Sequence, residues 1–351
     1  MSDYYQPADG VMDPADDPDL HAAKRFLERN YLNDPDSGVH TVAIGLNEER
    51  GVETGELAVV AYVDDKSPAG RLLARSETPI PPVIEVGGRR ILTDVKVMPS
   101  PKDLRLHLYD GGSRGLQAVG IQYHYSHAVT THRQCHNCPI PGGVQIAPRN
   151  APWVGTLGLA LVVDGRPHAI TNAHVTGLDG NGREMVQPSP GGDHFGVVNK
   201  VVGIRFDGQP NYIDAAVIDT RRTGGPYGDE VWTVNNVSLD VGTLAGQHRL
   251  AQLGDPVIKS GRTTGVTRGR VVGVEGTSHV GYDEGTGVFA RQYIIRGDGG
   301  DFSAGGDSGS LILHAETLQP LGLLFAGGGG ETIANPIAFV LDWCQGSLIT
   351  E

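Results

Sequence analysis

Glycine is the residue that most limits what this chain can fold into. The 351 residues include 51 glycines and 22 prolines, with no Gly-X-Y period. Such a composition favours short strands joined by many turns over long helices or a collagen triple helix. The length allows two or three domains, although a β-barrel protein can use about 200 residues or more in one domain. We therefore expect an all-β or α+β protein with a sizeable core.

Charge, cysteine content and the lack of long apolar runs argue against several classes of partner and location. The formal net charge of −13 and the isoelectric point near 5.4 argue against the broad basic surface that binds nucleic acid or anionic lipid. The three cysteines are too few to staple a secreted scaffold of this size. Residues 1–17 lack the basic and apolar regions of a signal peptide, and no apolar run approaches the roughly 18 residues of a membrane helix. The sequence predicts a soluble, cytoplasmic protein that binds neither nucleic acid nor membrane.

The chain divides into four predicted regions. Between residues 17 and 33 apolar residues recur at helical spacing, and Asp17 and Pro18 suit the N-cap and the first helical position. Strands are expected at 39–46, 56–63 and 91–97. The regions are a disordered tail (1–16), a small α+β domain (17–138), a Gly- and Pro-containing linker (139–150) and a second domain (151–346). The α+β domain has no catalytic constellation, so we expect it to serve packing, recognition or control.

A dense group of histidines and cysteines lies between residues 124 and 138. The candidate metal ligands in it are His132, Cys135, His136 and Cys138. A structural zinc site needs four converging ligands and usually shows a second well-spaced pair, which this stretch lacks. An ordinary loop is the simplest interpretation, and a metal site and a labile disulfide remain open as alternatives.

The stretch 305–310, Gly-Gly-Asp-Ser-Gly-Ser, suits a nucleophilic serine. Glycines on both sides of Ser308 let the backbone turn tightly and approach a bound carbonyl closely. The apolar residues 311–313 predict a strand that holds this loop in place. Gly-Asp-Ser-Gly also suits any polar turn, so a catalytic interpretation needs a histidine base and a carboxylate that orients it.

His174 and Asp214 are the candidates for these two partners. Two strands are expected at 155–163 and 167–175, with a hairpin at Asp164-Gly165, and His174 lies where the second of them ends. A histidine in that position is often structural. Asp214 opens the apolar run 214–218, where an acid is costly to bury unless a group such as histidine pairs with it.

The order His174, Asp214, Ser308 resembles that of the chymotrypsin-like serine peptidases and differs from that of subtilisins and α/β-hydrolases. The three residues are separated by 40 and 94 positions, against about 45 and about 93 in the chymotrypsin prototype. The local sequences resemble the family's Thr-Ala-Ala-His, Asp-Ile-Ala-Leu and Gly-Asp-Ser-Gly blocks. Here they are Thr-Asn-Ala-His (171–174), Asp-Ala-Ala-Val (214–217) and Gly-Asp-Ser-Gly (306–309).

The resemblance extends beyond these three blocks. Residues 259–269 are similar to a strand-turn-strand segment of streptogrisin-type bacterial members. A phosphate-binding loop is excluded there, because Ile258 stands where that loop requires glycine before Lys259. More loosely, the whole chain resembles trypsin-like proteins of the plant narrow-leaf type and their bacterial relatives. The resemblance implies two six-stranded antiparallel β-barrels with the site in the cleft between them.

The resemblance also implies the activity of a serine endopeptidase that cleaves peptides or proteins through an acyl-enzyme. His174 would act as general base toward Ser308, and Asp214 would orient the imidazole. The backbone N–H groups of Gly306 and Ser308 would bind the developing oxyanion. No metal or organic cofactor is required, and assembly into a homo-oligomer would restrict access to such a site in the cytoplasm.

The same alignment indicates the substrate preference. Phe302 occupies the position where trypsin carries the acid that selects Arg or Lys, and Ser303 follows it. The opposite wall of the pocket is expected from Phe325 and Gly327. These residues predict an apolar P1 side chain, whereas an alignment shifted by one residue would place Asp301 in the pocket and reverse the preference.

Activation and function leave alternatives open. Secreted family members need a newly cut amino terminus that pairs with the acid before the serine, here Asp307, and no convincing cleavage sequence precedes the second domain. We therefore expect the uncut chain to be competent, or to be switched by assembly or ligand through the α+β domain. The alternative functions are a catalytically silent binding or scaffolding protein and an esterase or acyl transferase that uses the same three residues.

Overall fold

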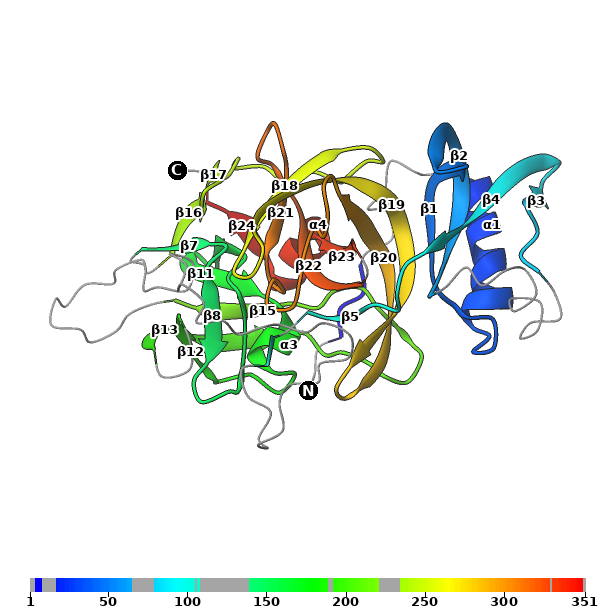
Figure 1. Cartoon of the computed structure of the whole chain (residues 1–351). Helices are drawn as coiled ribbons and strands as arrows, with labels where there is room; N and C mark the ends of the chain where they lie inside the picture. Colours follow the sequence, from blue (N-terminus) through cyan, green and yellow to red (C-terminus); the bar gives the residue numbers. More distant parts are fainter. Residues whose placement is uncertain are drawn as a thin grey trace, which may run out of the picture.

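A computed structural model of the chain describes residues 4–7, 17–64, 79–104, 106–107, 139–188, 192–220, 234–328 and 330–349. Two β-barrels and a smaller unit of strands with one helix account for most of them, as Figure 1 shows. The fold is mainly β, with two β-barrels preceded by a small α+β region. No helix among the described residues combines the length and the apolar composition that crossing a membrane requires.

The second barrel is a closed ring of six antiparallel strands. Their order is β20-β23-β22-β21-β18-β19, and β19 pairs again with β20, which completes the ring. Closure leaves no free strand edge within the ring, so loops at its rim start from fixed positions. The members are β18 (Pro256–Gly261), β19 (Gly265–Tyr282), β20 (Gly285–Gly297), β21 (Leu311–His314), β22 (Pro320–Gly328) and β23 (Glu331–Pro336), followed by helix α4 (Ile337–Cys344).

The first barrel is built on a nine-stranded sheet in the order β24-β10-β11-β15-β13-β12-β8-β9-β6. Three short strands, β7, β16 and β17, form a separate sheet, and β14 pairs with β20. The elements are β6 (Leu106–His107), β7 (Ile140–Gly142), β8 (Gln145–Pro148), β9 (Trp153–Thr156), β10 (Leu159–Val163), β11 (Arg166–Thr171), α3 (Ala173–Thr176), β12 (Glu184–Gln187), β13 (Asp193–Val201), β14 (Pro210–Asn211), β15 (Ala216–Asp219), β16 (Val234–Ser238), β17 (Gly242–Thr243) and β24 (Gly346–Leu348).

The segment predicted as a linker, 139–150, is part of this barrel. β7 pairs with β16 and β8 pairs with β12 and β9, and Ile140, Val144 and Ile146 are buried in the core of the barrel. Burial of these apolar side chains stabilises strands in a stretch whose glycines and prolines suggested a free connection. The predicted hairpin at Asp164-Gly165 is confirmed between β10 and β11, and both of its residues have positive φ.

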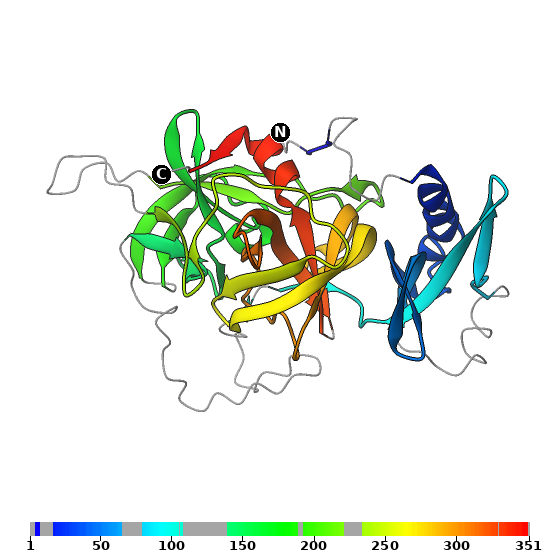
Figure 2. The same ribbon diagram turned by 90° about the horizontal axis from the view of Figure 1, so that it is seen from above.

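The predicted N-terminal helix is confirmed. Helix α1 (Pro18–Leu27) continues as a π-helical turn, η1 (Glu28–Leu32), and Asp17 accepts hydrogen bonds from the N–H groups of Asp19 and Leu20 as its N-cap. The predicted strands are present as β1 (Val39–Glu49), β2 (Val52–Val63) and β4 (Arg89–Val97), with β3 (Val83–Val86) beside β4. Together these elements form the α+β unit at one end of the molecule in Figures 1 and 2.

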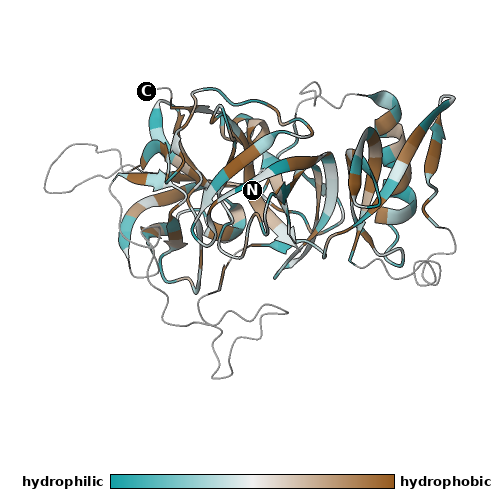
Figure 3. Ribbon diagram, turned by 45° about the horizontal axis from the view of Figure 1, so that its top comes forward, coloured by the Kyte–Doolittle hydropathy of each residue, from teal (hydrophilic) through white to brown (hydrophobic). Residues whose placement is uncertain are grey.

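Strand β1 joins the α+β unit to the second barrel. It pairs antiparallel with β2 on one side and with β19 on the other, so both units share one twelve-stranded sheet. On one face Val42 and Ile44 belong to the same apolar cluster as α1, and on the other face Ala43 and Tyr62 cluster with Ile294 of β20. Figure 3 shows apolar residues in brown along both the strands and the helix of this unit.

Four residues of the predicted disordered tail are described. Tyr5 donates from its hydroxyl to Asp342 of α4 at 2.9 Å, and its ring lies 6.2 Å from that of Phe339. Arg205 stacks on the ring of Tyr4 with 4.1 Å between the guanidinium carbon and the ring centroid. Tyr4 and Tyr5 are therefore in contact with the barrels, while 1–3 and 8–16 lie outside the described residues.

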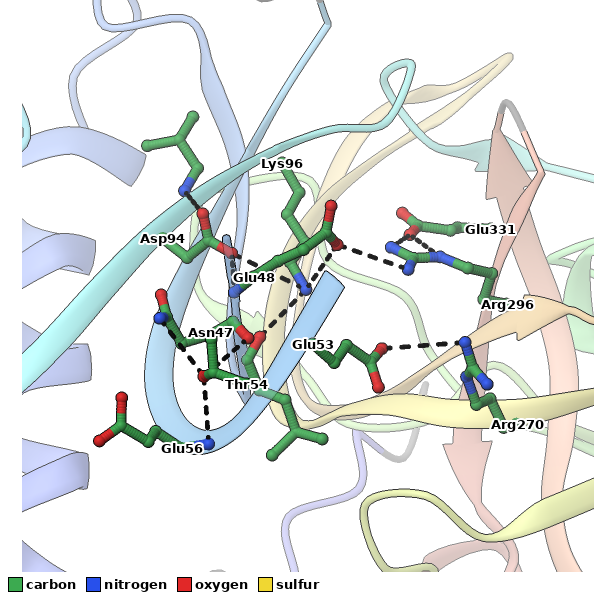
Figure 4. A network of polar contacts seen from close by, with 12 residues as sticks. Asn47, Glu48, Glu53, Thr54, Glu56, Asp94, Lys96, Arg270, Arg296 and Glu331 are labelled. Carbon is green, nitrogen blue, oxygen red and sulfur yellow. Dashed lines mark hydrogen bonds and ion pairs between the residues drawn. The ribbon is translucent and has the colours of Figure 1, made fainter. Parts of the chain in front are cut away.

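A network of charges crosses the junction between β1 and the second barrel, as Figure 4 shows. Lys96 Nζ lies 3.6 Å from a carboxylate oxygen of Glu48, and Arg296 Nη1 lies 3.9 Å from the same oxygen. Arg296 also donates to Glu331 Oε1 from Nε at 3.1 Å and from Nη2 at 2.6 Å. Glu48 of β1 is thereby connected to β20 and to the first residue of β23.

Glu331 gives this junction a pH dependence. Its side chain is buried, and its Oε2 has no hydrogen-bond partner among the described residues. Burial therefore raises the pKa of this carboxyl above its ordinary value near 4.5, and Arg296 offsets only part of the effect. A carboxyl whose pKa is higher in the folded than in the unfolded protein stabilises the native state at pH values below its unfolded-state pKa. This stabilisation is lost as the pH rises through the folded-state pKa.

We therefore expect Glu331→Gln to gain stability relative to the native chain as pH rises from about 4 to about 7. Glutamine keeps an acceptor for Arg296 and never carries the buried charge. The measurement is the free energy of urea unfolding of both chains at the two pH values. A relative loss of stability by the variant over this range would contradict the assignment.

Candidate active site

The loop between β20 and β21 presents Ser308. Gly306 and Gly309 in this loop have φ values of +97° and +94°, which L side chains rarely adopt. A Cβ on Gly309 would lie 2.1 Å from the carbonyl oxygen of Thr156, and one on Gly306 would lie 2.7 Å from Arg262 Cδ. Glycine is required at both positions, and the predicted tight turn around Ser308 is confirmed.

His174 and Asp214 form a buried pair. His174 Nδ1 lies 2.5 Å from Asp214 Oδ2, and the backbone N–H of His174 donates to Oδ1 at 3.3 Å. Both side chains have no exposed surface. A carboxylate only accepts hydrogen bonds, so Nδ1 is the protonated nitrogen and Nε2 of the neutral imidazole is left as the basic one.

The sequence suggested that His174 lies at the end of a strand, and this prediction is wrong. β11 ends at Thr171, and His174 lies in the helical turn α3 that follows. Asp214 lies two residues before β15. These two chain segments are adjacent because β11 and β15 are paired antiparallel, with Thr171 opposite Ala216.

Three residues that sequence reasoning missed hold Asp214 in place. Tyr282, at the end of β19, donates from its hydroxyl to Asp214 Oδ2 at 2.9 Å. Asn335 of β23 accepts from the N–H of Asp214 at 3.1 Å, and Asn172 donates to its carbonyl at 2.7 Å. Asn172 lies within the Thr-Asn-Ala-His block, but Tyr282 and Asn335 are remote in sequence and carry no motif.

The nucleophile loop packs against the strand that leads to His174. Thr171 Oγ1 donates to the carbonyl of Thr156 at 2.8 Å, and the N–H of Thr156 donates to the carbonyl of Ser308 at 2.8 Å. The hydroxyl of Ser308 donates to the carbonyl of Phe325 at 3.2 Å, and His174 Nε2 has no partner among the described residues. The hydrogen bond between Ser308 and His174 is therefore unmade in this structure, and the serine hydroxyl would have to turn from the carbonyl of Phe325 toward Nε2 before His174 could act as its base.

Asp307, the acid before the candidate nucleophile, is paired inside the protein. Lys259 Nζ lies 3.5 Å from its Oδ2, and both side chains are fully buried. The carboxylate also accepts from the N–H groups of Thr263 at 2.8 Å and Ala304 at 3.0 Å and from the hydroxyl of Thr264 at 2.6 Å. The strand-turn-strand segment predicted at 259–269, formed by β18 and β19, thus supplies the cation that holds the nucleophile loop.

The residues predicted to form a specificity pocket lie near one another. A Cβ on Gly327 would lie 3.5 Å from Ser303 Oγ, and Ser303 is hydrogen-bonded to Thr332 at 2.6 Å. Phe302 is fully buried, whereas Asp301 is exposed. The ring of Phe325 packs against Phe289 in the core with 4.7 Å between the centroids. Phe325 therefore faces the site through its backbone carbonyl.

A segment of the chain itself lies against the nucleophile loop. Strand β5 (Lys102–Asp103) pairs antiparallel with β22, with Lys102 opposite Gly327. The next residue, Leu104, donates from its N–H to the carbonyl of Phe325 at 3.2 Å, and its carbonyl accepts from the N–H of Gly306. One predicted oxyanion donor is therefore already engaged by a backbone carbonyl. No local pattern in the sequence marks this segment.

The candidate metal ligands His132, Cys135, His136 and Cys138 lie outside the described residues. In the part of the chain that the structure describes, no three or more His, Cys, Asp or Glu side chains are grouped as a metal site. The one described cysteine, Cys344, is a buried thiol in α4, and burial raises its pKa to about 11.

No family model and no curated protein matches this chain. Among solved structures it is similar to a glutamic acid-specific serine protease (21% identity, TM-score 0.45, 60% of this chain and 100% of that one) and to Thermobifida fusca protease A (23%, 0.44, 60% and 99%). A Cellulomonas bogoriensis chymotrypsin gives similar values (24%, 0.42, 60% and 100%). The similarity concerns the fold alone, and a relationship to plant narrow-leaf-type proteins finds no support in it.

Proposed function

We propose that the chain is a serine endopeptidase in which His174, Asp214 and Ser308 act together. The observation that carries the proposal is the fully buried pair of His174 and Asp214, with 2.5 Å between Nδ1 and Oδ2, next to a glycine-framed serine. An imidazole in this tautomer presents its basic nitrogen away from the carboxylate, as a general base must. The pairing of a buried acid with a histidine also explains how Asp214 is tolerated inside an apolar run.

The expected reaction is acyl transfer to Ser308 and then to water. His174 Nε2 takes the proton of Ser308 as the hydroxyl attacks the peptide carbonyl, and it returns that proton to the leaving amine. Asp214 stabilises the imidazolium that forms between these steps. Tyr282, which donates to the same carboxylate oxygen, is a positioning residue for Asp214.

The oxyanion would be bound by the backbone N–H groups of Gly306 and Ser308. The N–H of Gly306 already donates to a carbonyl oxygen, that of Leu104, which supports its role as a donor to the substrate. Loss of one such donor typically costs about 3 kcal/mol of transition-state stabilisation. In secreted members of the resembled family, a newly cut amino terminus pairs with the acid before the serine. In this chain Lys259 would supply that positive charge to Asp307, so the nucleophile loop would stay formed without a cut.

The proposed preference is for an apolar P1 side chain. An apolar residue, Leu104, lies beside two of the residues expected to line the pocket: a Cβ on Gly327 would lie 3.3 Å from Leu104 Cδ1 and 3.5 Å from Ser303 Oγ. The third, Phe302, is fully buried. An acid that would select Arg or Lys is missing from these three positions. In this proposal residues 151–346 perform the chemistry, and the α+β unit carries the segment that lies in the site.

Labelling with a fluorophosphonate probe tests the proposal. We expect modification of Ser308 in the native chain, more rapid modification in Leu104→Asp, whose charged side chain does not suit the pocket, and none in Ser308→Ala or His174→Ala. Profiling of Leu104→Asp with a peptide library is expected to show cleavage after apolar residues. Absence of labelling in every variant would favour a silent scaffold, cleavage of esters alone would favour an esterase, and a profile dominated by Arg or Lys would reject the apolar pocket.

A further inference from the structure

The segment 101–104 is bound as an added strand of the second barrel. On one side β5 pairs antiparallel with β22, with Asp103 opposite Ala326 and Lys102 opposite Gly327. On the other side Gly281 of β19 donates to the carbonyl of Pro101 at 3.0 Å. Backbone hydrogen bonds to an extended chain are the way in which peptides add to a sheet. The segment is thus held as a peptide ligand would be, and its place is labelled β5 in Figure 1.

Leu104 is the residue of this segment that meets the catalytic groups. Its carbonyl oxygen accepts from Gly306, and its N–H donates to the carbonyl of Phe325, the same oxygen that accepts the Ser308 hydroxyl. A Cβ on Gly327 would lie 3.3 Å from Leu104 Cδ1, so the leucine side chain lies against the wall of the pocket. Leu104 therefore occupies the P1 position of the proposed site.

The chain is also anchored beyond the reactive position. Strand β6 pairs antiparallel with β9 of the first barrel, with Leu106 opposite Val154. Only Arg105 separates Leu104 from Leu106 in the sequence. The described residues before and after Arg105 are thus paired with two different barrels, through β22 and β9. A bound substrate is expected to be held on both sides of the bond that is cut. A strand that only covered the site would need just one of the two pairings, β5 with β22 or β6 with β9.

We propose that the bond between Leu104 and Arg105 is a substrate of the chain's own active site, an inference that rests on the proposed function. Ser308 Oγ adds to the carbonyl carbon of Leu104 while His174 takes the hydroxyl proton. The bond to the nitrogen of Arg105 then breaks as His174 returns that proton to it, which leaves an ester between Leu104 and Ser308. Water adds to this ester with His174 as base, and Ser308 regains its proton as the ester breaks. The products are a chain that ends in the Leu104 carboxyl and a chain that begins with the Arg105 amine.

Synthesis of the full chain in a cell-free system followed by intact-mass analysis tests this. We expect two fragments, with N-terminal sequencing of the second starting at Arg105, and an uncut Ser308→Ala chain. Both flanks and the site belong to one molecule, so a tenfold dilution of the reaction is expected to leave the rate of cutting unchanged.

Variants of Leu104 separate self-cleavage from other effects. Leu104→Asp is expected to reduce cutting by at least about a hundredfold, because a charge in an apolar pocket is costly to desolvate. Leu104→Met, which keeps size and polarity, is expected to be cut within about tenfold of the native rate. The matched control is Val97→Asp, the same type of change at an exposed residue of β4, and it is expected to be cut as the native chain is.

The outcomes keep this inference distinct from the proposed function. If the native chain stays intact while Leu104→Asp reacts with the probe and cleaves peptides, self-cleavage is wrong and the peptidase remains. If Ser308→Ala is cut after Leu104 as well, a foreign protease is responsible and self-cleavage is again wrong. If no variant is labelled and none is cut, both are wrong.

Discussion

Ser308→Ala is expected to lower kcat/KM for a peptide with an apolar P1 residue by about a millionfold, because removal of a triad serine leaves only binding and oxyanion stabilisation. His174→Ala is expected to lose about as much, and the double variant no more than either single one, since the two side chains act as a unit. Measurement in the Leu104→Asp background keeps the chain's own segment from competing with the peptide.

Ser347→Ala is the matched control for this series. Ser347 is an exposed serine on β24 in the same fold, and its hydroxyl takes no part in the proposed chemistry. Its kcat/KM is expected to equal that of the parent. A Ser308→Ala chain that keeps a tenth of the parent activity, or a double variant whose losses multiply, would exclude the proposed triad.

Lys259→Met is expected to destabilise the protein by about 3 to 5 kcal/mol, because it leaves Asp307 as a buried carboxylate without its cation. Both side chains are fully buried with 3.5 Å between Nζ and Oδ2, so water cannot replace the lost partner. The loss corresponds to a fall in Tm of roughly 6 to 20 °C for a domain of about 200 residues. Labelling of Ser308 is expected to fall as well, since Asp307 orders the loop that carries it.

The double variant Lys259→Met/Asp307→Asn is the informative comparison. Removal of both charges restores electroneutrality in the core, so we expect it to recover part of the stability lost in the single variant. Arg270→Met is the control, because Arg270 is half exposed and lies 4.0 Å from Glu53, and surface pairs of this kind are worth about 0 to 1 kcal/mol. A Lys259→Met chain as stable as Arg270→Met would show that Asp307 does not depend on this cation.

The sequence located the candidate site because its parts are coded locally. Glycines at 306 and 309 are required by positive φ and by close contacts, so the nucleophile turn leaves a mark in the sequence itself. Asp17 and Pro18 mark the start of α1 in the same way, through capping chemistry that spans three residues. Features that depend on residues only a few positions apart are therefore predictable from one sequence.

Features that depend on pairing between distant segments were not predictable. Tyr282 lies 68 residues from Asp214, and the β5 segment meets β22 across more than half of the chain. The stretch 139–150 has the composition of a linker, and only its strand partners in the first barrel decide that it is buried. Propensity and spacing carry no information on such long-range choices.

The short connection between β4 and β5 sets how strongly the chain's own segment would compete with a peptide for the proposed active site. β4 ends at Val97, β5 begins at Lys102, and two of the four residues between them are prolines. Strand β1 fixes the near end of this tether by pairing with β19. A short tether of this kind gives its segment a local concentration in the millimolar range. A peptide substrate present at micromolar concentration would therefore reach the proposed active site rarely, and separation of β1 from β19 would weaken this competition without any change in a catalytic group.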